Sequence, residues 1–504
     1  MDDIQFQLKA VVKCSSSLDD NDIKLSELNG FMREFAEPLL KRGAPPGCGA
    51  EIEGWGVSGE QLKLDLRSDR FVRAHDALIR LKKELGRFLA KYRIGIRGIE
   101  IESYEITMNW EEGIKLRRLP FVKELKHSDG RLTLYLDVDY AALEKRIPDR
   151  LLRLLEEKKT AASWKGKSEH WELLFESRSE RKKSFRFDKD PTEEMVKRGW
   201  IRHAAGRGQW IYGPQITRIF RAFERVLIEE VLKPLGYEEM VFPKLVPWEV
   251  WKRSGHAKGI YPEAYYVCAP KTRDPEYWEE VMDYYKVTNE VPLGMIKDRI
   301  EPIGGLCYAQ CPPFWIFLMG KTLPDSILPI RVFDRSGTSH RYESGGLHGI
   351  ERLDEFHRVE IVWIGTKEQV IKHANELRER YRRIFAEILD IEWREAWVTP
   401  WFMAQEGKAG LAELKEVGTV DFEAILPYSG KWLEFQNVSV NGDKYPKGFS
   451  VKLQSGKELW SGCSGVGLER WAAVMLAQNG LEPEQWTEEF RRITGELPEV
   501  FRFL

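Results

Sequence analysis

The chain has 504 residues, a formal net charge of −2, and 42% hydrophobic against 31% charged residues. This length predicts at least two domains, each able to bury its own core, and the near-zero charge provides no overall field that would attract nucleic acid. The sequence contains neither a run of 18 apolar residues nor a basic-then-apolar N-terminal segment, so we expect no transmembrane helix and no secretory signal, and predict a cytoplasmic protein.

Six cysteines are scattered along the chain: Cys14, Cys48, Cys268, Cys307, Cys311 and Cys463. They are too few and too far apart for a disulfide scaffold. Reduced thiols are therefore expected, and metal ligation is the main alternative.

Residues 1–165 are predicted to form one α+β domain. Apolar residues alternate in some stretches and recur with helical spacing in others. The predicted strands are 6–12, 61–66, 94–108 and 131–138, and the predicted helices are 69–91 and 146–159.

The helix predicted at 69–91 lies in a locally basic part of the chain. Between Gln61 and Glu100 there are eleven Lys or Arg residues against five Asp or Glu. Such a surface can bind a nucleic-acid backbone, because Lys and Arg displace its counterions. Charge alone favours the simpler interpretation of a solvated helix face.

Residues 166–202 are predicted to be a linker, because they are polar and mixed in charge, with a short helix that begins at Pro191. Residues 203–504 are predicted to form a larger domain. A long amphipathic helix is expected over 215–232, followed by a glycine turn and a strand that ends at Pro243.

The stretch 330–364 is predicted to be two strands joined by a glycine-rich loop. Arg341 ends the first strand, Arg352 precedes the second, and Phe356 lies near the start of the second. Two arginines that converge on a loop suit a polyphosphate, because each guanidinium is a permanently charged bidentate donor. The alternative is a hairpin with solvated charges.

A glycine-rich turn near the C-terminus has the pattern Gly465-x-Gly467-x-x-Arg470 and leads into a helix. It ends in arginine and does not belong to an early βαβ unit, so a dinucleotide site of the Rossmann type is not expected.

Three features now stand in one order: the helix and strand that end at Pro243, the Arg341-Tyr-Glu343 hairpin, and the Gly465-to-Arg470 turn. Together they resemble the three signature motifs of class II aminoacyl-tRNA synthetases. Within that class, the segments 419–427 and 432–437 are similar to seryl-tRNA synthetases. The N-terminal part has no long heptad pattern for the coiled-coil arm of the common seryl enzyme, and it resembles the archaeal, methanogen-type and zinc-dependent form.

The resemblance implies an α+β fold, with a C-terminal catalytic domain built on an antiparallel sheet flanked by helices and an N-terminal α+β tRNA-binding domain. It implies that L-serine is activated with ATP to seryl-adenylate and transferred to the 3′ end of tRNA(Ser), with tRNA(Sec) as a further substrate. The segment 236–243 resembles a dimerisation element, so a homodimer is expected. In this context Arg73, Arg80 and Arg87 are expected to bind tRNA.

The resemblance also implies a zinc ion in the active site, with Cys311, Glu360 and Cys463 as its ligands and an open fourth position for the amino group of serine. Cys307 and Glu355 remain alternative ligands. Glu360 lies an even number of residues from Phe356 and shares its strand face, whereas Glu355 points to the other face.

The implied contacts with ATP are Arg341 at the α-phosphate, Glu343 at the adenine or amino-acid end, and Arg352 and Arg470 at the β- and γ-phosphates. Phe356 and Arg470 are expected to sandwich the adenine, and Glu434 to bind Mg²⁺. Catalysis is assigned to Arg341 and Arg470. The expected serine-binding residues are Trp401, Gln405, Asn437 and Glu360.

Two kinds of alternative remain open. A threonyl or prolyl enzyme of the same class is the nearer one, although the histidine ligands of the threonyl form are not found at Glu360 and Cys463. The other is a synthetase-like paralogue that activates an amino acid without charging tRNA. The three motif arginines and the basic N-terminal domain argue against that paralogue, and no segment resembles an editing domain.

Overall fold

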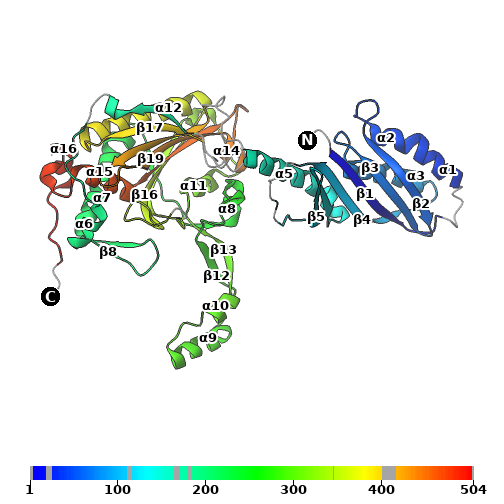
Figure 1. Cartoon of the computed structure of the whole chain (residues 1–504), viewed down its shortest axis with the longest axis horizontal. Helices are drawn as coiled ribbons and strands as arrows, with labels where there is room; N and C mark the ends of the chain where they lie inside the picture. The colour runs from blue at the N-terminus through cyan, green and yellow to red at the C-terminus, as the bar shows by residue number, and fades with distance from the viewer. Residues whose placement is uncertain are drawn as a thin grey trace. The chain divides into compact units, whose positions relative to one another are not determined.

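The computed structural model describes residues 4–18, 25–110, 116, 118–163, 171–179, 183–343, 346–399 and 416–501. The chain divides into two compact units, Met1–Gly166 and Lys167–Leu504 (Figure 1). No helix in the described residues is long and apolar enough to cross a membrane.

The first unit contains a six-stranded antiparallel sheet with the strand order β2-β3-β1-β4-β6-β5. Its strands are β1 (Ile4–Cys14), β2 (Ala50–Ser58), β3 (Gln61–Ser68), β4 (Ile96–Asn109), β5 (Val122–Ser128) and β6 (Arg131–Leu136). Its helices are α1 (Leu25–Gly30), α2 (Glu37–Lys41), α3 (Ala74–Ala90), α4 (Tyr140–Glu144) and α5 (Ile147–Ser163).

Helix α3 forms because its leucines recur on one side, and Leu78, Leu81 and Leu85 are fully buried against the sheet core. The helix begins at Ala74 and not at Asp69 as predicted. The reason is that the Asp69 carboxylate accepts hydrogen bonds from the backbone N–H groups of Gly49 and Phe71, which stabilises a turn before the helix.

The second unit contains an eight-stranded sheet with the order β10-β15-β16-β21-β19-β18-β17-β7. All neighbours are antiparallel except the parallel pair β10 and β15. The strands are β7 (Trp171–Glu176), β10 (Glu238–Glu239), β15 (Ile330–His340), β16 (Glu355–Gly365), β17 (Trp393–Val398), β18 (Gly418–Leu426), β19 (Lys431–Gly442) and β21 (Trp460–Gly467). The predicted α+β class with an antiparallel catalytic sheet flanked by helices is confirmed.

The segment 166–202 was predicted to be a linker, but its described parts belong to the second unit. Strand β7 pairs with β17 at the edge of the large sheet, and α6 (Pro191–Lys197) packs against the catalytic core through Met195. An edge strand pairs on one side only and buries less apolar surface, so its sequence lacks the alternation by which inner strands are recognised.

Two cores lie on opposite faces of the large sheet. Along β16, Val359 and Ile361 belong to one core and Val362 and Ile364 to the other, as the period of two requires. The first core includes α7 (Pro214–Leu227), α12 (Lys367–Arg383), α15 (Leu468–Asn479) and α16 (Glu488–Thr494). The second includes α8 (Trp248–Arg253), α11 (Cys311–Leu318) and α14 (Lys444–Gly448).

Smaller elements complete the second unit. They are the hairpin β8 (Ile201–His203) and β9 (Trp210–Tyr212), the pair β14 (Thr322–Leu323) and β20 (Lys452–Leu453), and the sheet β11 (Leu245–Pro247), β12 (Tyr266–Pro270) and β13 (Ile300–Leu306). Helices α9 (Pro275–Thr288) and α10 (Leu293–Arg299) lie at the far end of the β12–β13 ribbon, away from the large sheet (Figure 1).

Candidate active site

A cavity of about 310 Å³ opens over strands β16, β19 and β21 of the large sheet. Nine residues singled out from the sequence line it: Cys311, Arg341, Glu343, Phe356, Glu360, Glu434, Asn437, Cys463 and Arg470. Arg352 is exposed and does not line the cavity. Trp401 and Gln405 lie outside the described residues.

The period of two along the strands explains how these side chains converge. On β16, Phe356, Arg358 and Glu360 point into the cavity, while Val359 packs in the core behind the sheet. Glu355 points elsewhere, because its carboxylate accepts a hydrogen bond of 2.6 Å from the Nε2 of Gln209.

Cys311, Glu360 and Cys463 come together on the cavity wall. One potential ligand atom from each lies within 4.8 Å of the other two. Cys311 is the first residue of α11, and Glu360 and Cys463 are on the neighbouring strands β16 and β21. Cys307 is not part of this cluster, and its thiol donates to the carbonyl oxygen of Ala309 at 3.2 Å.

The electrostatics of this cluster fit a bound cation. The neighbouring Cys463 thiol and then burial raise the pKa of Cys311 well above its ordinary value, and burial raises the pKa of Glu360. The Glu360 oxygen Oε2 accepts a hydrogen bond of 2.8 Å from Arg358. The other oxygen, Oε1, is buried and accepts no hydrogen bond of normal geometry from any described residue, although the Cys311 thiol lies beside the carboxyl group.

A cation bound among these three residues would lower the pKa values of Cys311 and Glu360 and give the Oε1 of Glu360 a partner. It would do so because a cation stabilises the thiolate form of cysteine and binds a carboxylate oxygen directly. Two sulfur ligands and one oxygen suit a borderline-soft ion such as zinc and leave one tetrahedral position open. The donor set therefore fits the metal that the sequence implies.

Arg358 is one residue of this site that the sequence analysis missed. Its guanidinium lies against Gly465 on β21, and a Cβ at that position would overlap it, so a larger residue there would require the Arg358 side chain to move. It shares its strand face with Phe356 and Glu360, and that parity is the signal by which it could have been found.

Two of the three motif arginines, Arg341 and Arg470, are held by carboxylates. Arg341 lies just beyond the end of β15, with its Nε 3.1 Å from Glu263 and its guanidinium 5.4 Å from the centre of the Tyr308 ring. Arg470, near the start of α15, donates from Nη1 to the Glu434 carboxylate at 2.7 Å. Both guanidinium groups face the cavity, where they can bind a negatively charged ligand.

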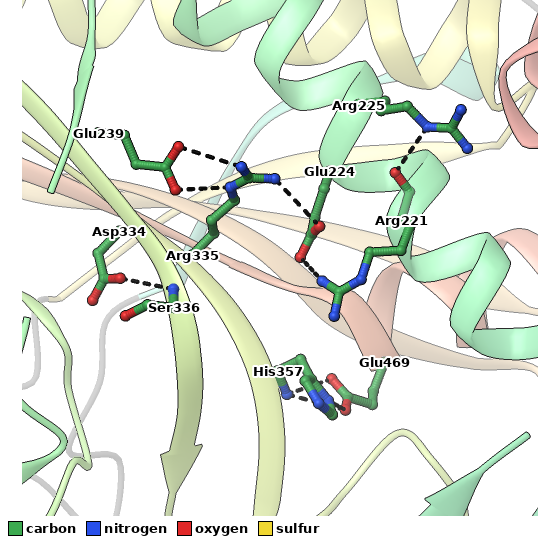
Figure 2. Close-up of polar contacts among 9 residues, drawn as sticks. All are labelled: Arg221, Glu224, Arg225, Glu239, Asp334, Arg335, Ser336, His357 and Glu469. Carbon is green, nitrogen blue, oxygen red and sulfur yellow. Dashed lines mark hydrogen bonds and ion pairs between the residues drawn. The ribbon is translucent and has the colours of Figure 1, made fainter. Parts of the chain in front are cut away.

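A second missed residue, Glu469, ties α15 to β16. Its buried carboxylate accepts from the backbone N–H of His357 at 2.9 Å and from the His357 ring at 2.7 Å, and the two side chains point toward each other in Figure 2. The hydrogen bond to Glu469 raises the pKa of His357. Arg470 follows Glu469 on α15, and Phe356 precedes His357 on β16, two residues before Arg358. The contact therefore holds Arg470 in a fixed position relative to Phe356.

A chain of ion pairs crosses the edge of the sheet where β10 joins β15 (Figure 2). Arg335 lies 2.8 Å from Glu239 and 3.8 Å from the buried carboxylate of Glu224, which also pairs with Arg221. These contacts connect α7, β10 and β15, which carry the first two sequence motifs.

The three arginines expected to bind tRNA lie in the first unit, along or just before α3. Arg73 pairs with Asp149, Arg80 donates to the carbonyl oxygen of Arg42 at 2.9 Å, and Arg87 donates to Glu84 at 2.7 Å. Burial alone would raise the pKa of Asp149, but hydrogen bonds from His75 and Arg73 lower it to about 2.

Sequence comparisons place this geometry in a family. One family profile, described as a tRNA-binding domain, matches residues 4–157, and another, the tRNA synthetase class II core domain (G, H, P, S and T), matches residues 308–479. The type-2 serine–tRNA ligase of Methanothrix thermoacetophila is 60% identical over 99% of this chain and 100% of its own length. This chain belongs to the type-2 serine–tRNA ligases.

Other members of the type-2 serine–tRNA ligases extend the match. The ligase of Methanococcoides burtonii is 59% identical over the full length of both chains, and that of Methanothermobacter thermautotrophicus is 35% identical over 96% of both. A crystal structure of the M. kandleri SerRS in complex with A. aeolicus tRNASec has 32% identity and a TM-score of 0.86, covering 99% of both chains. The resemblance to the methanogen-type seryl enzymes is confirmed.

Proposed function

We propose that this type-2 serine–tRNA ligase activates L-serine with ATP and transfers the seryl group to the 3′ end of tRNA(Ser). The observation that carries the proposal is the convergence of Cys311, Glu360 and Cys463 on one wall of a cavity that also holds Arg341 and Arg470. A sulfur-rich metal site next to two phosphate-binding cations suits the joining of an amino acid to a nucleotide.

We propose that Cys311, Glu360 and Cys463 hold a zinc ion. When bound, zinc supplies an open coordination position that can take the amino group of serine. The residues of the chain orient the substrate: Asn437, on β19, lines the cavity and can pair with the serine hydroxyl. Trp401 and Gln405 belong to the same proposed pocket, outside the described residues.

The proposed ATP site uses the cations of the cavity. Arg341 neutralises the charge that develops on the α-phosphate when the serine carboxylate attacks it and pyrophosphate leaves. Arg470 and Arg352 bind the β- and γ-phosphates, and Phe356 stacks on the adenine. Glu343 binds the adenine or amino-acid end, and Glu434, which pairs with Arg470, would bind Mg²⁺ beside the phosphates.

The first unit is proposed to bind the tRNA through Arg73, Arg80 and Arg87. All three already contact protein atoms. Arg73 and Arg87 are in ion pairs, and Arg87 is the more exposed of these two, with 66% of its side chain accessible. Since Lys and Arg on one helix face can displace counterions from phosphates, the unit would recognise tRNA largely by its backbone and shape. tRNA(Sec) is a proposed second substrate.

We further propose a homodimer that forms through the motif around 236–243, and a cytoplasmic location. Val241 within this motif is 74% exposed and Leu245 just after it is 44% exposed, so apolar surface is available there. The proposed location is compatible with the cysteines, none of which is in a disulfide.

The test is ATP–pyrophosphate exchange with serine, threonine, proline or alanine, before and after zinc removal. We expect exchange with serine alone, because alanine leaves a buried hydroxyl partner unpaired and can lose several kcal/mol of binding. Exchange should disappear with the metal and return with zinc. Exchange that survives metal removal would contradict the zinc role, and no exchange with any amino acid would favour the paralogue that does not charge tRNA.

A further inference from the structure

The segment Arg341–Glu343 carries two residues of the proposed ATP site but belongs to no helix or strand. Strand β15 ends at His340, one residue before it. Glu343 is nevertheless buried, and Arg341 faces the cavity. Something other than secondary structure must therefore hold this segment in place.

Backbone hydrogen bonds from each of the three residues provide that support. The N–H of Arg341 donates to the Asp354 carbonyl oxygen at 2.8 Å, and the N–H of Tyr342 donates to the Glu263 carbonyl oxygen at 2.8 Å. The N–H of Glu343 donates to the Asp354 carboxylate oxygen Oδ1 at 2.8 Å. Asp354 thus binds the segment at both ends.

The second carboxylate oxygen of Asp354 anchors this residue in turn. Oδ2 accepts hydrogen bonds from the guanidinium of Arg207 and from the hydroxyl of Tyr265. Asp354 is 1% exposed, so this charge is buried and its partners are essential to it. Arg207 and Tyr265 lie far from Asp354 in the sequence and come from different elements.

Arg207 completes a clamp around Glu343. Its Nη2 donates to the Glu343 carbonyl oxygen at 2.9 Å, so both backbone polar groups of Glu343 are fixed, one by Asp354 and one by Arg207. The Arg207 guanidinium also lies 3.8 Å from the centre of the Tyr342 ring, within the range of a cation–π contact. The planar guanidinium of Arg207 can contact Asp354, Glu343 and Tyr342 at the same time, whereas the single ammonium group of a lysine cannot.

The conformation of the β8–β9 hairpin places Arg207 beside Asp354. Gly208 at its tip has a φ of +60°, and a Cβ there would lie 2.6 Å from the Asp354 nitrogen. Its carbonyl oxygen accepts from the Asp354 N–H at 3.1 Å. Glycine is required both by the left-handed conformation and by the close approach.

We propose that Asp354 and Arg207 are positioning residues for the adenylate-forming step. Neither lines the cavity, so they act through the segment that they hold, keeping Arg341 aimed at the α-phosphate and Glu343 in its buried position. Preorganised charge is effective because the protein does not have to reorient it during the reaction. This inference rests on the proposed function.

The test uses the full-length, zinc-loaded enzyme with Arg207→Met, Arg207→Lys, Asp354→Asn and the double variant Arg207→Met/Asp354→Asn. Arg207→Met should lower kcat for serine-dependent exchange by as much as about 100-fold, the effect of a displacement of about 1 Å. The KM for serine, the zinc content and the Kd for tRNA should not change. Arg207→Lys should restore part of the activity, because it keeps the charge beside Asp354.

The double variant shows whether the two residues act as one unit. Since the two residues pair with each other and both hold the backbone of Glu343, the double variant should be no slower than the slower single variant. Arg492→Met and Asp283→Asn are the matched controls, since both lie in exposed ion pairs on the outer helices α16 and α9. These controls should keep full exchange activity.

Three outcomes would overturn the inference. Arg207→Met could exchange as fast as the unaltered enzyme, the two losses could simply multiply in the double variant, or exchange, tRNA binding and thermal stability could all fall together, as in a general loss of folding. Failure of the proposed function is distinct from these outcomes, because the unaltered enzyme would then show no exchange with serine.

Discussion

At the scale of single residues, Arg358 balances the charge of the proposed metal site. Two thiolates and one carboxylate carry more negative charge than a divalent cation neutralises, and Arg358, 2.8 Å from Glu360, supplies the remaining positive charge. It also orients the Glu360 carboxylate so that the oxygen Oε1 is left for the metal. Partners of metal ligands usually contribute to metal affinity in this way.

Replacement of Arg358 by methionine should therefore weaken zinc binding by about 10- to 100-fold. The measurement is competition for zinc with a chelator of known affinity. Arg383→Met, which changes an exposed arginine in a surface ion pair, is the control and should bind zinc as the unaltered enzyme does. Unchanged zinc affinity in Arg358→Met would contradict the role in charge balance.

At the scale of elements, β16 shows how one strand serves a core and a site together. Its cavity face carries Phe356 and Glu360, and its opposite face carries His357, which packs against the rings of Tyr212 and Phe220 with centroid separations of 5.7 and 5.8 Å. The link between His357 and Glu469 joins this strand to α15. The strand and the helix with Arg470 are therefore held in one relative position.

The stability that this link contributes should depend on pH. Glu469 holds the pKa of His357 above its ordinary value of 6.5, so the protonated ring stabilises the folded state. A raised pKa in the folded state gives a contribution that is fully present below the unfolded pKa and is lost as pH rises through the folded pKa. The Tm difference between the unaltered enzyme and His357→Asn should accordingly be largest below about pH 6.5 and shrink at higher pH.

The control for this experiment is His127→Asn, since His127 is exposed on β5 in the other unit. It should shift Tm little at any pH. A Tm difference for His357→Asn that grows as pH rises would show that the charged form of this histidine does not stabilise the fold.

At the scale of the whole molecule, the two units have separate cores and separate proposed tasks. The core of the first unit is built from residues between Ile4 and Leu155, whereas the cores of the second begin at Met195. Every residue that lines the cavity lies between His256 and Arg470. The amino-acid chemistry therefore depends on the second unit, and the first would contribute to tRNA recognition.

A fragment of residues 167–504 should retain serine-dependent pyrophosphate exchange and lose the ability to charge tRNA. Its cooperative thermal unfolding and its zinc content provide the check that it is folded. A folded fragment without exchange activity would mean that the first unit is needed for adenylate formation as well.

Much of this protein could be predicted from local sequence. Several inner strands and the amphipathic helices have clear periodicity, so α3, β15, β16 and the predicted parity of Phe356 and Glu360 agree with the structure. Among the strands that were missed, β2, β5 and β7 lie at sheet edges, where burial on one side leaves a weaker pattern. The inner strands β17 and β21 were also missed, and the stretch of β21 with Gly465 and Gly467 was predicted to be a turn because of its glycines.

The order of the motifs depends only on residue type and spacing along the chain, and the resemblance carried by those motifs implied the class of fold and the candidate cysteines and carboxylates. Which of these candidates come together is seen only in the folded chain. Cys311 and not Cys307 lies beside Cys463, Arg358 joins the site, and Arg207 reaches Asp354 across the fold. The physical reason is that such contacts depend on how separate elements pack, and no local pattern of hydrophobicity or charge encodes the distance between side chains far apart in sequence.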